Sequence, residues 1–138
     1  MARKNRLTNK QPLFKKIDCF LIRVPDLDKA LDFYSNRLGH ELRWRKKNVA
    51  AGLRLGDTEL VLLAEKGKME VDLLVSSVPK AIENFVKAGG KVVRKPFDID
   101  IGKCAVVRDP FGNILVLLDT SKGLYKTDKN KNIIGRRA

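Results

Sequence analysis

Residues 20–42 read FLIRVPDLDKALDFYSNRLGHEL, and residues 71–93 read VDLLVSSVPKAIENFVKAGGKVV. A shift of 51 residues (71 minus 20) lays the first stretch over the second without a gap, and their apolar positions fall in phase. With a shift of 55 residues (115 minus 60), LVLL at 60–63 lies over LVLL at 115–118. Two matches in the same chain order indicate an internally duplicated unit.

Each copy of the unit reads as a strand, a helix and three further strands. In the first copy, alternating branched residues predict a strand at 17–24, and an apolar stripe closed by Gly39 predicts a helix at 26–38. The remaining strands of this copy are predicted at 41–46, 50–55 and 59–64. The second copy is predicted to contain a strand at 70–75, a helix at 78–88, and strands at 91–95, 103–108 and 113–118.

This order of elements predicts an α+β fold, in which two tandem β-α-β-β-β modules form a curved mixed sheet around a concave cavity. The predicted divisions of the chain are a basic N-terminal extension (1–15), a first module (16–66), a second module (67–120) and a basic C-terminal tail (121–138). Two alternatives stay open for the tail: it forms a short hairpin, or it covers an edge of the sheet.

Alternation along the first strand of each module separates the two faces of the sheet. The residues expected beneath the helices are Phe20, Ile22, Val24, Val71, Leu73 and Val75. The residues expected on the concave face are Cys19, Leu21, Arg23, Glu70, Asp72 and Leu74. Parity along the next strand places Trp44 with Leu42, toward the helix, so the role predicted for Trp44 is core packing.

The chain carries a formal net charge of +13, and most of the excess lies in residues 1–16 and 121–138. Basic ends can bind nucleic acid or an anionic surface weakly by counterion release, or they simply keep a protein soluble. A nucleic-acid or anionic-partner adaptor is therefore a minor alternative, which strong salt dependence of binding would reveal.

No apolar run approaches the roughly 20 residues of a membrane span. No secretory signal is recognisable either, so we predict a cytoplasmic protein.

Three sequence features are similar to those of the vicinal oxygen chelate superfamily, which includes glyoxalases, bleomycin resistance proteins and extradiol dioxygenases. They are VPDLDKALDFY at 24–34 with its Leu38-Gly39 ending, AGG at 88–90, and DPFGN at 109–113. The resemblance covers roughly residues 16–120 and implies the paired-module fold. It does not fix the function, because this fold hosts unrelated chemistries.

The resemblance also implies where metal-dependent members hold a divalent ion, near the start of the first strand and on the last strand of each module. Carried over by the two offsets, the first-strand positions fall on Cys19 and Glu70, and the last-strand positions fall on Val61 and Val116. Only Glu70 is a good hard ligand, and valine cannot coordinate an ion. We therefore predict no metal ligands, no divalent metal and no other cofactor.

The first hypothesis for function is then a protein that binds a small organic ligand in the concave cavity. The residues predicted to contact the ligand are Cys19, Arg23, Arg54, Glu59, Val61, Glu70, Asp72 and Val116. Bleomycin itself is disfavoured as that ligand, because it is cationic and the chain has a large positive excess.

The alternative is an enzyme of the same superfamily, a lyase, isomerase or dioxygenase that uses Glu70 with or without a divalent metal ion. In the metal-free form of this alternative, Glu70 is the general base and Cys19 is an acid or nucleophile. The resemblance further implies a homodimer, and the sequence leaves the arrangement of the two chains open.

Overall fold

The computed structural model describes residues 11–137, so residues 1–10 of the predicted basic extension and Ala138 lie outside the described residues. The elements of the first module are β1 (Lys16–Arg23), α2 (Leu27–Leu31), η1 (Asp32–Arg37), β2 (Leu42–Lys46), β3 (Ala50–Leu55) and β4 (Thr58–Leu63). Those of the second module are β5 (Glu70–Leu74), α3 (Val78–Lys87), β6 (Lys91–Ile99), β7 (Gly102–Arg108) and β8 (Ile114–Leu118). The strands β9 (Leu124–Thr127) and β10 (Ile133–Arg137) follow.

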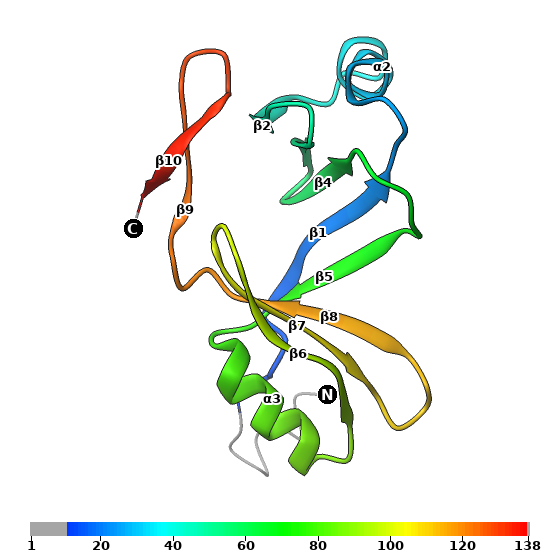
Figure 1. Ribbon diagram of the computed structural model, residues 1–138, viewed down its shortest axis with the longest axis vertical. Coiled ribbons are helices and arrows are strands. Elements are labelled where there is room, and N and C mark those ends of the chain that lie inside the picture. The colour runs from blue at the N-terminus through cyan, green and yellow to red at the C-terminus, as the bar shows by residue number, and fades with distance from the viewer. Residues whose placement is uncertain (1–10, 138) are drawn as a thin grey trace.

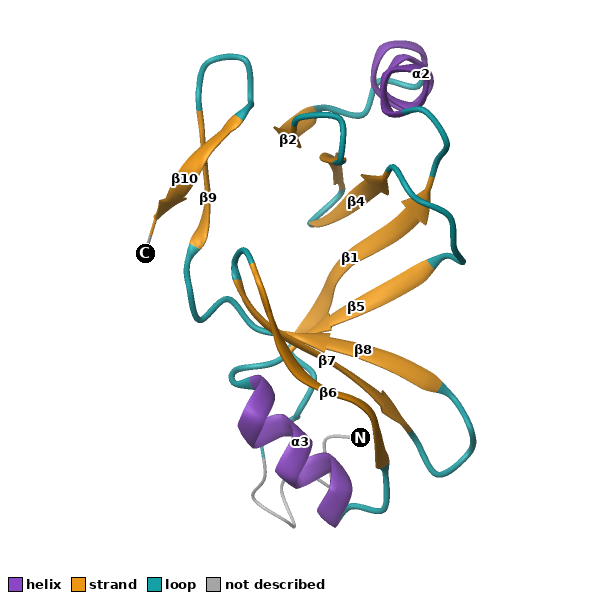
Figure 2. Cartoon of the chain, viewed as in Figure 1, coloured by secondary structure: helices purple, strands orange, loops and turns teal. Residues whose placement is uncertain are grey.

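One eight-stranded sheet carries both modules, in the order β2-β3-β4-β1-β5-β8-β7-β6. The first strands of the two modules, β1 and β5, pair antiparallel at its centre, and each pairs in parallel with the last strand of its own module. The sheet is curved and mixed, which confirms the predicted fold class (Figure 1). Figure 2 shows the two helical regions at opposite ends of the molecule, with the strands between them.

The register of the sheet agrees with the two offsets found in the sequence. Leu21 of β1 faces Val61 of β4, and Asp72 of β5 faces Val116 of β8. Asp72 lies 51 positions after Leu21 in the sequence, and Val116 lies 55 positions after Val61, as the internal repeat predicted. The two modules are therefore related by an approximate twofold axis that passes between β1 and β5.

Each helical region covers the convex face of its own module. Around α3, the buried residues Val78, Ala81 and Phe85 pack against Ala105, Val107 and Leu117 of the sheet. Around α2, the buried residues are Leu27, Ala30, Ala51, Leu53, Leu60 and Leu62. Both helices begin at a side-chain cap, because Asp26 accepts from the Lys29 backbone N–H and Ser77 accepts from that of Lys80.

The first helical region differs from the continuous helix expected at 26–38. It is a short α-helix followed by a π-helical segment, in which the backbone N–H of Leu38 donates to the carbonyl of Phe33 over 3.0 Å. Asp32, at the junction, accepts hydrogen bonds from the side chains of Asn36 and Arg37. These contacts stabilise the wider turn, which apolar periodicity cannot distinguish from an ordinary α-helix.

The C-terminal tail forms a two-stranded hairpin of β9 and β10, one of the two alternatives left open by the sequence. It folds back beside β2 rather than extending the sheet (Figure 1). The Arg45 backbone N–H donates to the carbonyl of Lys131 over 2.8 Å, and Arg45 forms an isolated bridge with Asn132. Within residues 11–137, no helix has the length and apolar character needed to cross a bilayer.

The buried carboxylate of Asp119 joins the end of β8 to the tail. It accepts from the backbone N–H groups of Val78 and Lys103, over 2.8 and 2.9 Å, and from the hydroxyl of Ser121 over 2.8 Å. Burial alone would raise the pKa of Asp119, but these donors outweigh it and lower that pKa. This network fixes the start of α3 and the direction in which the chain leaves the sheet.

Candidate functional site

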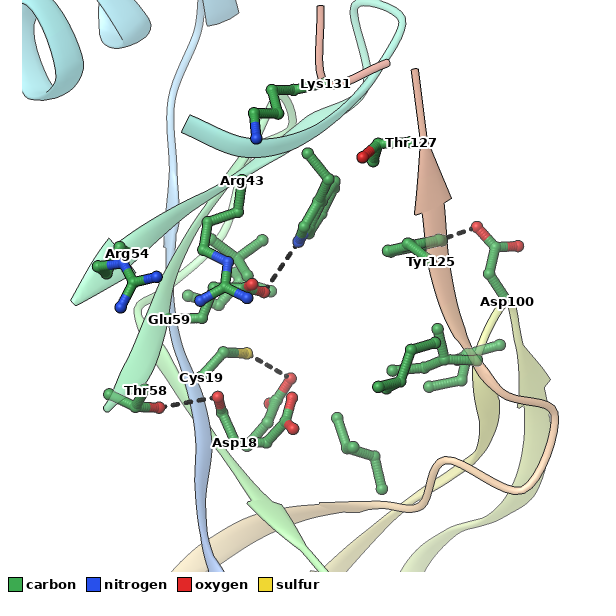
Figure 3. A pocket seen from close by; sticks show the side chains of 18 of the residues that line it. Asp18, Cys19, Arg43, Arg54, Thr58, Glu59, Asp100, Tyr125, Thr127 and Lys131 are labelled. Carbon is green, nitrogen blue, oxygen red and sulfur yellow. Dashed lines mark hydrogen bonds between the residues drawn. The ribbon is translucent and has the colours of Figure 1, made fainter. Parts of the chain in front are cut away.

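A cavity of about 600 Å³ lies between the concave face of the first module, the turn that joins β6 to β7, and the C-terminal hairpin. Cys19 and Glu59 project from the sheet, and Tyr125 and Asp100 lie across the cavity from them (Figure 3). This volume suits a small organic molecule, because ligand pockets typically enclose about 300–1,000 Å³.

Five of the eight residues predicted to contact a ligand line this cavity, namely Cys19, Arg54, Glu59, Val61 and Asp72. The other three, Arg23, Glu70 and Val116, are not among its lining residues. Their roles as ligand contacts therefore stay predictions, and they would need a ligand that reaches beyond this cavity.

Asp72 lies on the cavity wall at the junction of the two modules, and its side chain is only 6% exposed. The thiol of Cys19 donates a hydrogen bond to Asp72 Oδ2 over 3.4 Å. Oδ1 has no hydrogen-bond partner among the described residues. Burial first, and then the neighbouring carboxylate of Glu70, raise the pKa of Asp72 to about 8. This environment favours the protonated acid at neutral pH.

Glu70, the predicted general base, belongs to a separate network that runs toward the loop between β4 and β5. The Arg23 guanidinium lies 3.4 Å from a carboxylate oxygen of Glu70 and 3.4 Å from one of Glu65. Arg23 also donates to the carbonyl of Lys68 over 2.6 Å. In this arrangement Glu70 acts on the cavity indirectly, because its charge helps to keep Asp72 protonated.

Cys19 is a buried thiol beside several acids. Burial, followed by the charges of Asp72 and Asp18, raises the pKa of the Cys19 thiol above its usual value. The thiolate is the nucleophilic form of cysteine, so this environment opposes nucleophilic chemistry at Cys19. The thiol serves here as a hydrogen-bond donor to Asp72.

The prediction that Trp44 packs beneath the helix is wrong. Its indole lines the cavity and donates from Nε1 to Glu59 over 2.9 Å, and it packs against Cys19, Leu21 and Val61. The register between β2 and β3 shifts between Leu42 and Trp44, so simple alternation fails there. Leu42 stays with the helix-covered core, while Trp44 turns to the concave face.

Two half-buried acids lie near Asp72 and Cys19. Burial raises the pKa of Glu59 and of Asp18, and this effect outweighs the hydrogen bond from Trp44 to Glu59 and the charge of Lys16 near Asp18. Asp18 was not predicted to line the cavity, because it neighbours Cys19 in the chain. The β1–β5 register is irregular between Ile17 and Cys19, which brings Asp18 to the cavity wall.

Asp100, in the turn between β6 and β7, closes the far side of the cavity. Its carboxylate accepts from Lys46 Nζ over 2.8 Å and from the hydroxyl of Tyr125 over 3.0 Å, and its carbonyl accepts from Arg136 over 2.8 Å. These contacts join β2 of the first module, a turn of the second module and the hairpin. Sequence reasoning missed this junction, because no local pattern links residues so far apart in the chain.

The residues present do not fit the divalent metal site that the fold family implies. Val61 lines the cavity where a ligand is expected, and Glu70 is engaged by Arg23. Within residues 11–137, no group of three or more His, Cys, Asp or Glu side chains is arranged to hold an ion. The sole histidine, His40, lies with Nδ1 3.1 Å from the Arg54 carbonyl and is not among the cavity-lining residues.

A comparison with family models matches residues 16–117 to the Glyoxalase/Bleomycin resistance protein/Dioxygenase superfamily. A relative from Mycolicibacterium smegmatis, named only as an uncharacterized protein, is 28% identical over 112 residues. That match covers 78% of this chain and 96% of the relative. The matched family region ends at residue 117, so the β9–β10 hairpin lies beyond it.

Solved structures share the fold. Methylmalonyl-CoA epimerase from Mycobacterium tuberculosis is 17% identical, with a TM-score of 0.64 over 81% of this chain and 92% of that one. A hypothetical protein from Bacillus halodurans C-125 is 16% identical, with a TM-score of 0.65 over 80% and 98%. NAD-dependent benzaldehyde dehydrogenase from Legionella pneumophila is 20% identical, with a TM-score of 0.61 over 75% and 98%. At these identities the likeness shows the fold alone.

Proposed function

The chain belongs to the Glyoxalase/Bleomycin resistance protein/Dioxygenase superfamily, and from that premise we propose that it binds a small organic ligand in the concave cavity without a divalent metal ion. The observation that carries this proposal is the cavity itself. It has about 600 Å³ of space, an aromatic wall at Trp44 and Tyr125, and the buried acid Asp72 with a raised pKa.

The cavity combines apolar and charged side chains, and charged residues make up half of its lining. In ligand sites apolar side chains supply affinity, and polar groups fix the orientation of the ligand. Here the apolar contacts come from Leu21, Val61, Ile99, Ile101, Leu118 and Leu124. Because burial favours the protonated form of Asp72, this acid can donate a hydrogen bond to a ligand without the desolvation cost of a buried charge.

A thermal-shift screen of small organic molecules tests the proposal, with the fluorescence of Trp44 as a second readout. Trp44 is the only tryptophan in the chain and lines the cavity, so a change in its emission reports on the site directly. A true ligand should raise the melting temperature and change this emission over the same concentration range. Stabilisation without any change at Trp44 would place the ligand elsewhere and count against the cavity.

The metal-free part of the proposal has its own test. Protein purified without a chelator should carry no stoichiometric nickel, zinc, manganese or iron by mass spectrometry. Added ions should leave the melting temperature unchanged. A bound ion near one per chain, or a stabilisation that Glu70→Ala abolishes, would contradict the proposal and favour a metal-dependent enzyme.

Asp72 supports a second candidate function, an enzyme that moves a proton to or from its substrate. A buried acid with a pKa of about 8 is suited to general acid–base work near neutral pH. The two functions differ in the fate of a bound molecule in D₂O. A molecule recovered unchanged and without deuterium indicates a binding protein, whereas deuterium incorporation that Asp72→Asn abolishes indicates the enzyme.

A further inference from the structure

Among the charged side chains that line the cavity, only acids are half-buried or buried, namely Asp18, Glu59, Asp72 and Asp100, whereas the acids Glu41 and Asp57 are exposed. The bases Lys16, Arg43, Arg54, Lys131 and Arg137 are all exposed. Water and salt screen exposed charges strongly and buried ones weakly. The inner cavity is therefore acidic, although the chain as a whole carries a net charge of +13.

Both aromatic rings of the cavity are hydrogen-bonded to carboxylates. Trp44 donates from its indole to Glu59, and Tyr125 donates from its hydroxyl to Asp100. The ring centroids lie 4.9 Å apart, with the planes tilted by 50°. A donor group bound to an anion makes its ring more electron-rich, and electron-rich rings attract cations through their faces. The aromatic wall and the inner acids thus both favour a positively charged group on the ligand.

Asp72 is the inner acid whose negative charge is not offset by a neighbouring base. It is 6% exposed, it lines the cavity, and its Oδ1 has no hydrogen-bond partner among the described residues. The groups that face it from its own strand and from neighbouring strands are Glu70, Asp18, Cys19 and Cys104. These groups are acids or thiols. The guanidinium of Arg23 is bonded to Glu70 instead.

From this arrangement we propose that the ligand of the cavity is a small organic cation, an amine or quaternary ammonium group on an apolar body. The charged group lies between the Trp44–Tyr125 wall and the inner acids, and the body contacts the apolar residues opposite. This inference rests on the proposed function, because it names the class of molecule that the cavity binds.

The positive charge of the whole chain does not oppose this assignment at the distances that matter. At physiological ionic strength the screening length is about 8 Å. Arg54 is also paired with Glu41 over 3.1 Å. Lys131 and Arg137 of the basic C-terminal segment line the cavity, but both are exposed, so solvent screens their charges. The net charge slows the approach of a cation, whereas the inner acids and rings determine how tightly it is held.

Three probes that share one aromatic body test the charge preference: benzyltrimethylammonium, benzyl alcohol and benzoate. Each is titrated into the full-length protein while Trp44 fluorescence is followed. Benzyltrimethylammonium should bind roughly 5- to 30-fold more tightly than the other two, because a desolvated cation–π contact contributes roughly 1–2 kcal/mol. Its affinity should also increase as pH rises through about 8, where Asp72 loses its proton.

Variants that remove a single negative charge show which residues cause the preference for a cation. Glu59→Gln should lower the affinity for benzyltrimethylammonium by about fivefold or more at neutral pH, whereas Asp72→Asn should do so only above about pH 8, where Asp72 is charged, and should thereby remove the rise with pH. Glu83→Gln is the matched control, because it removes one carboxylate from the exposed face of α3, away from the cavity. That control should bind the probe as the parent protein does.

The outcomes separate this inference from the function on which it rests. If benzoate or benzyl alcohol binds as tightly as benzyltrimethylammonium, the cation assignment is wrong and the binding cavity stands. If none of the three probes changes Trp44 emission, and the thermal-shift screen also finds no ligand, both proposals fail. Equal loss of all three probes in Asp72→Asn would show a structural role for Asp72 and overturn its role in charge recognition.

Discussion

The thiol of Cys19 donates to Oδ2 of Asp72 over 3.4 Å, across the antiparallel pairing of β1 with β5. This contact lies where the two modules meet, so one hydrogen bond on the cavity wall links the first strands of the two modules.

Replacing Asp72 by asparagine should stabilise the protein at neutral and alkaline pH. The carboxyl has an ordinary pKa of 3.8 and a folded-state pKa of about 8. Between these values the unfolded chain has lost a proton that the folded chain keeps, so stability falls as pH rises from about 4 to about 8 and is level above that. An asparagine amide reproduces the protonated acid, since its oxygen can accept from Cys19 and its nitrogen can donate to Glu70.

The expected gain for Asp72→Asn is roughly 2–5 kcal/mol in the free energy of unfolding at about pH 8, vanishing near about pH 4. Urea denaturation at several pH values measures it. Asp57→Asn is the matched control, because Asp57 is an exposed carboxylate at the margin of the same cavity, and it should change little. A variant less stable than the parent at about pH 8 would contradict the pKa assigned to Asp72.

Neither cysteine should react with iodoacetamide in the folded protein. Burial is the main cause that raises the pKa of both thiols, to about 12 for Cys104 and further for Cys19. Alkylation requires the thiolate, which is scarce in this environment. Mass spectrometry should show no label on the folded chain at about pH 8 and two labels in urea. Fast labelling of Cys19 alone would indicate an exposed, reactive thiol and revive its role as a nucleophile.

Gly52→Ala should displace the Trp44 indole from the cavity. A methyl group at position 52 would overlap the indole nitrogen and its neighbouring ring atoms, so only glycine leaves room for the ring. Overpacking of this kind typically costs about 1–3 kcal/mol. The tryptophan emission should shift to longer wavelength as the ring becomes exposed. The same change in a Trp44→Ala background should cost less, and equal costs in both backgrounds would show that the two residues do not interact.

Asp100→Asn should loosen the hairpin without much effect on global stability. The variant weakens the bonds from Lys46 and Tyr125, and surface ion pairs of this kind contribute under about 1 kcal/mol. Amide hydrogen exchange in β9 and β10 should become faster, while that in β1 and β5 should stay unchanged. Asp98→Asn is the control two residues away, because Asp98 pairs with Lys103 and Lys122 instead. Unchanged exchange in the hairpin would show that Asp100 does not anchor it.

The sequence was sufficient for the parts of the fold that repeat. Offsets of 51 and 55 residues pair Leu21 with Asp72 and Val61 with Val116, and the strand register has those same relations. Repetition makes such predictions strong, because two independent stretches must fit one pattern. The four-residue change in offset falls between residues 93 and 115 of the second module, where a loop could absorb it, and it did not disturb the strands.

The sequence was insufficient wherever the backbone departs from simple alternation. Trp44 and Asp18 both reach the cavity because the strand pairing is irregular next to them, and irregularities of this kind carry no clear sequence signal. Asp100 and Tyr125 were missed for another reason. Their contact joins a turn and a tail that only the complete fold brings together, which local patterns cannot foresee.

The approximate twofold axis between the modules places Leu21 of β1 and Asp72 of β5 in equivalent positions. An apolar side chain and an acid thus occupy corresponding positions in two halves that otherwise share one backbone plan. A symmetric floor would accept a molecule in either of two opposed orientations with equal energy. This floor is not symmetric, because Leu21 is apolar and Asp72 is an acid, so a molecule placed on it would have one preferred direction.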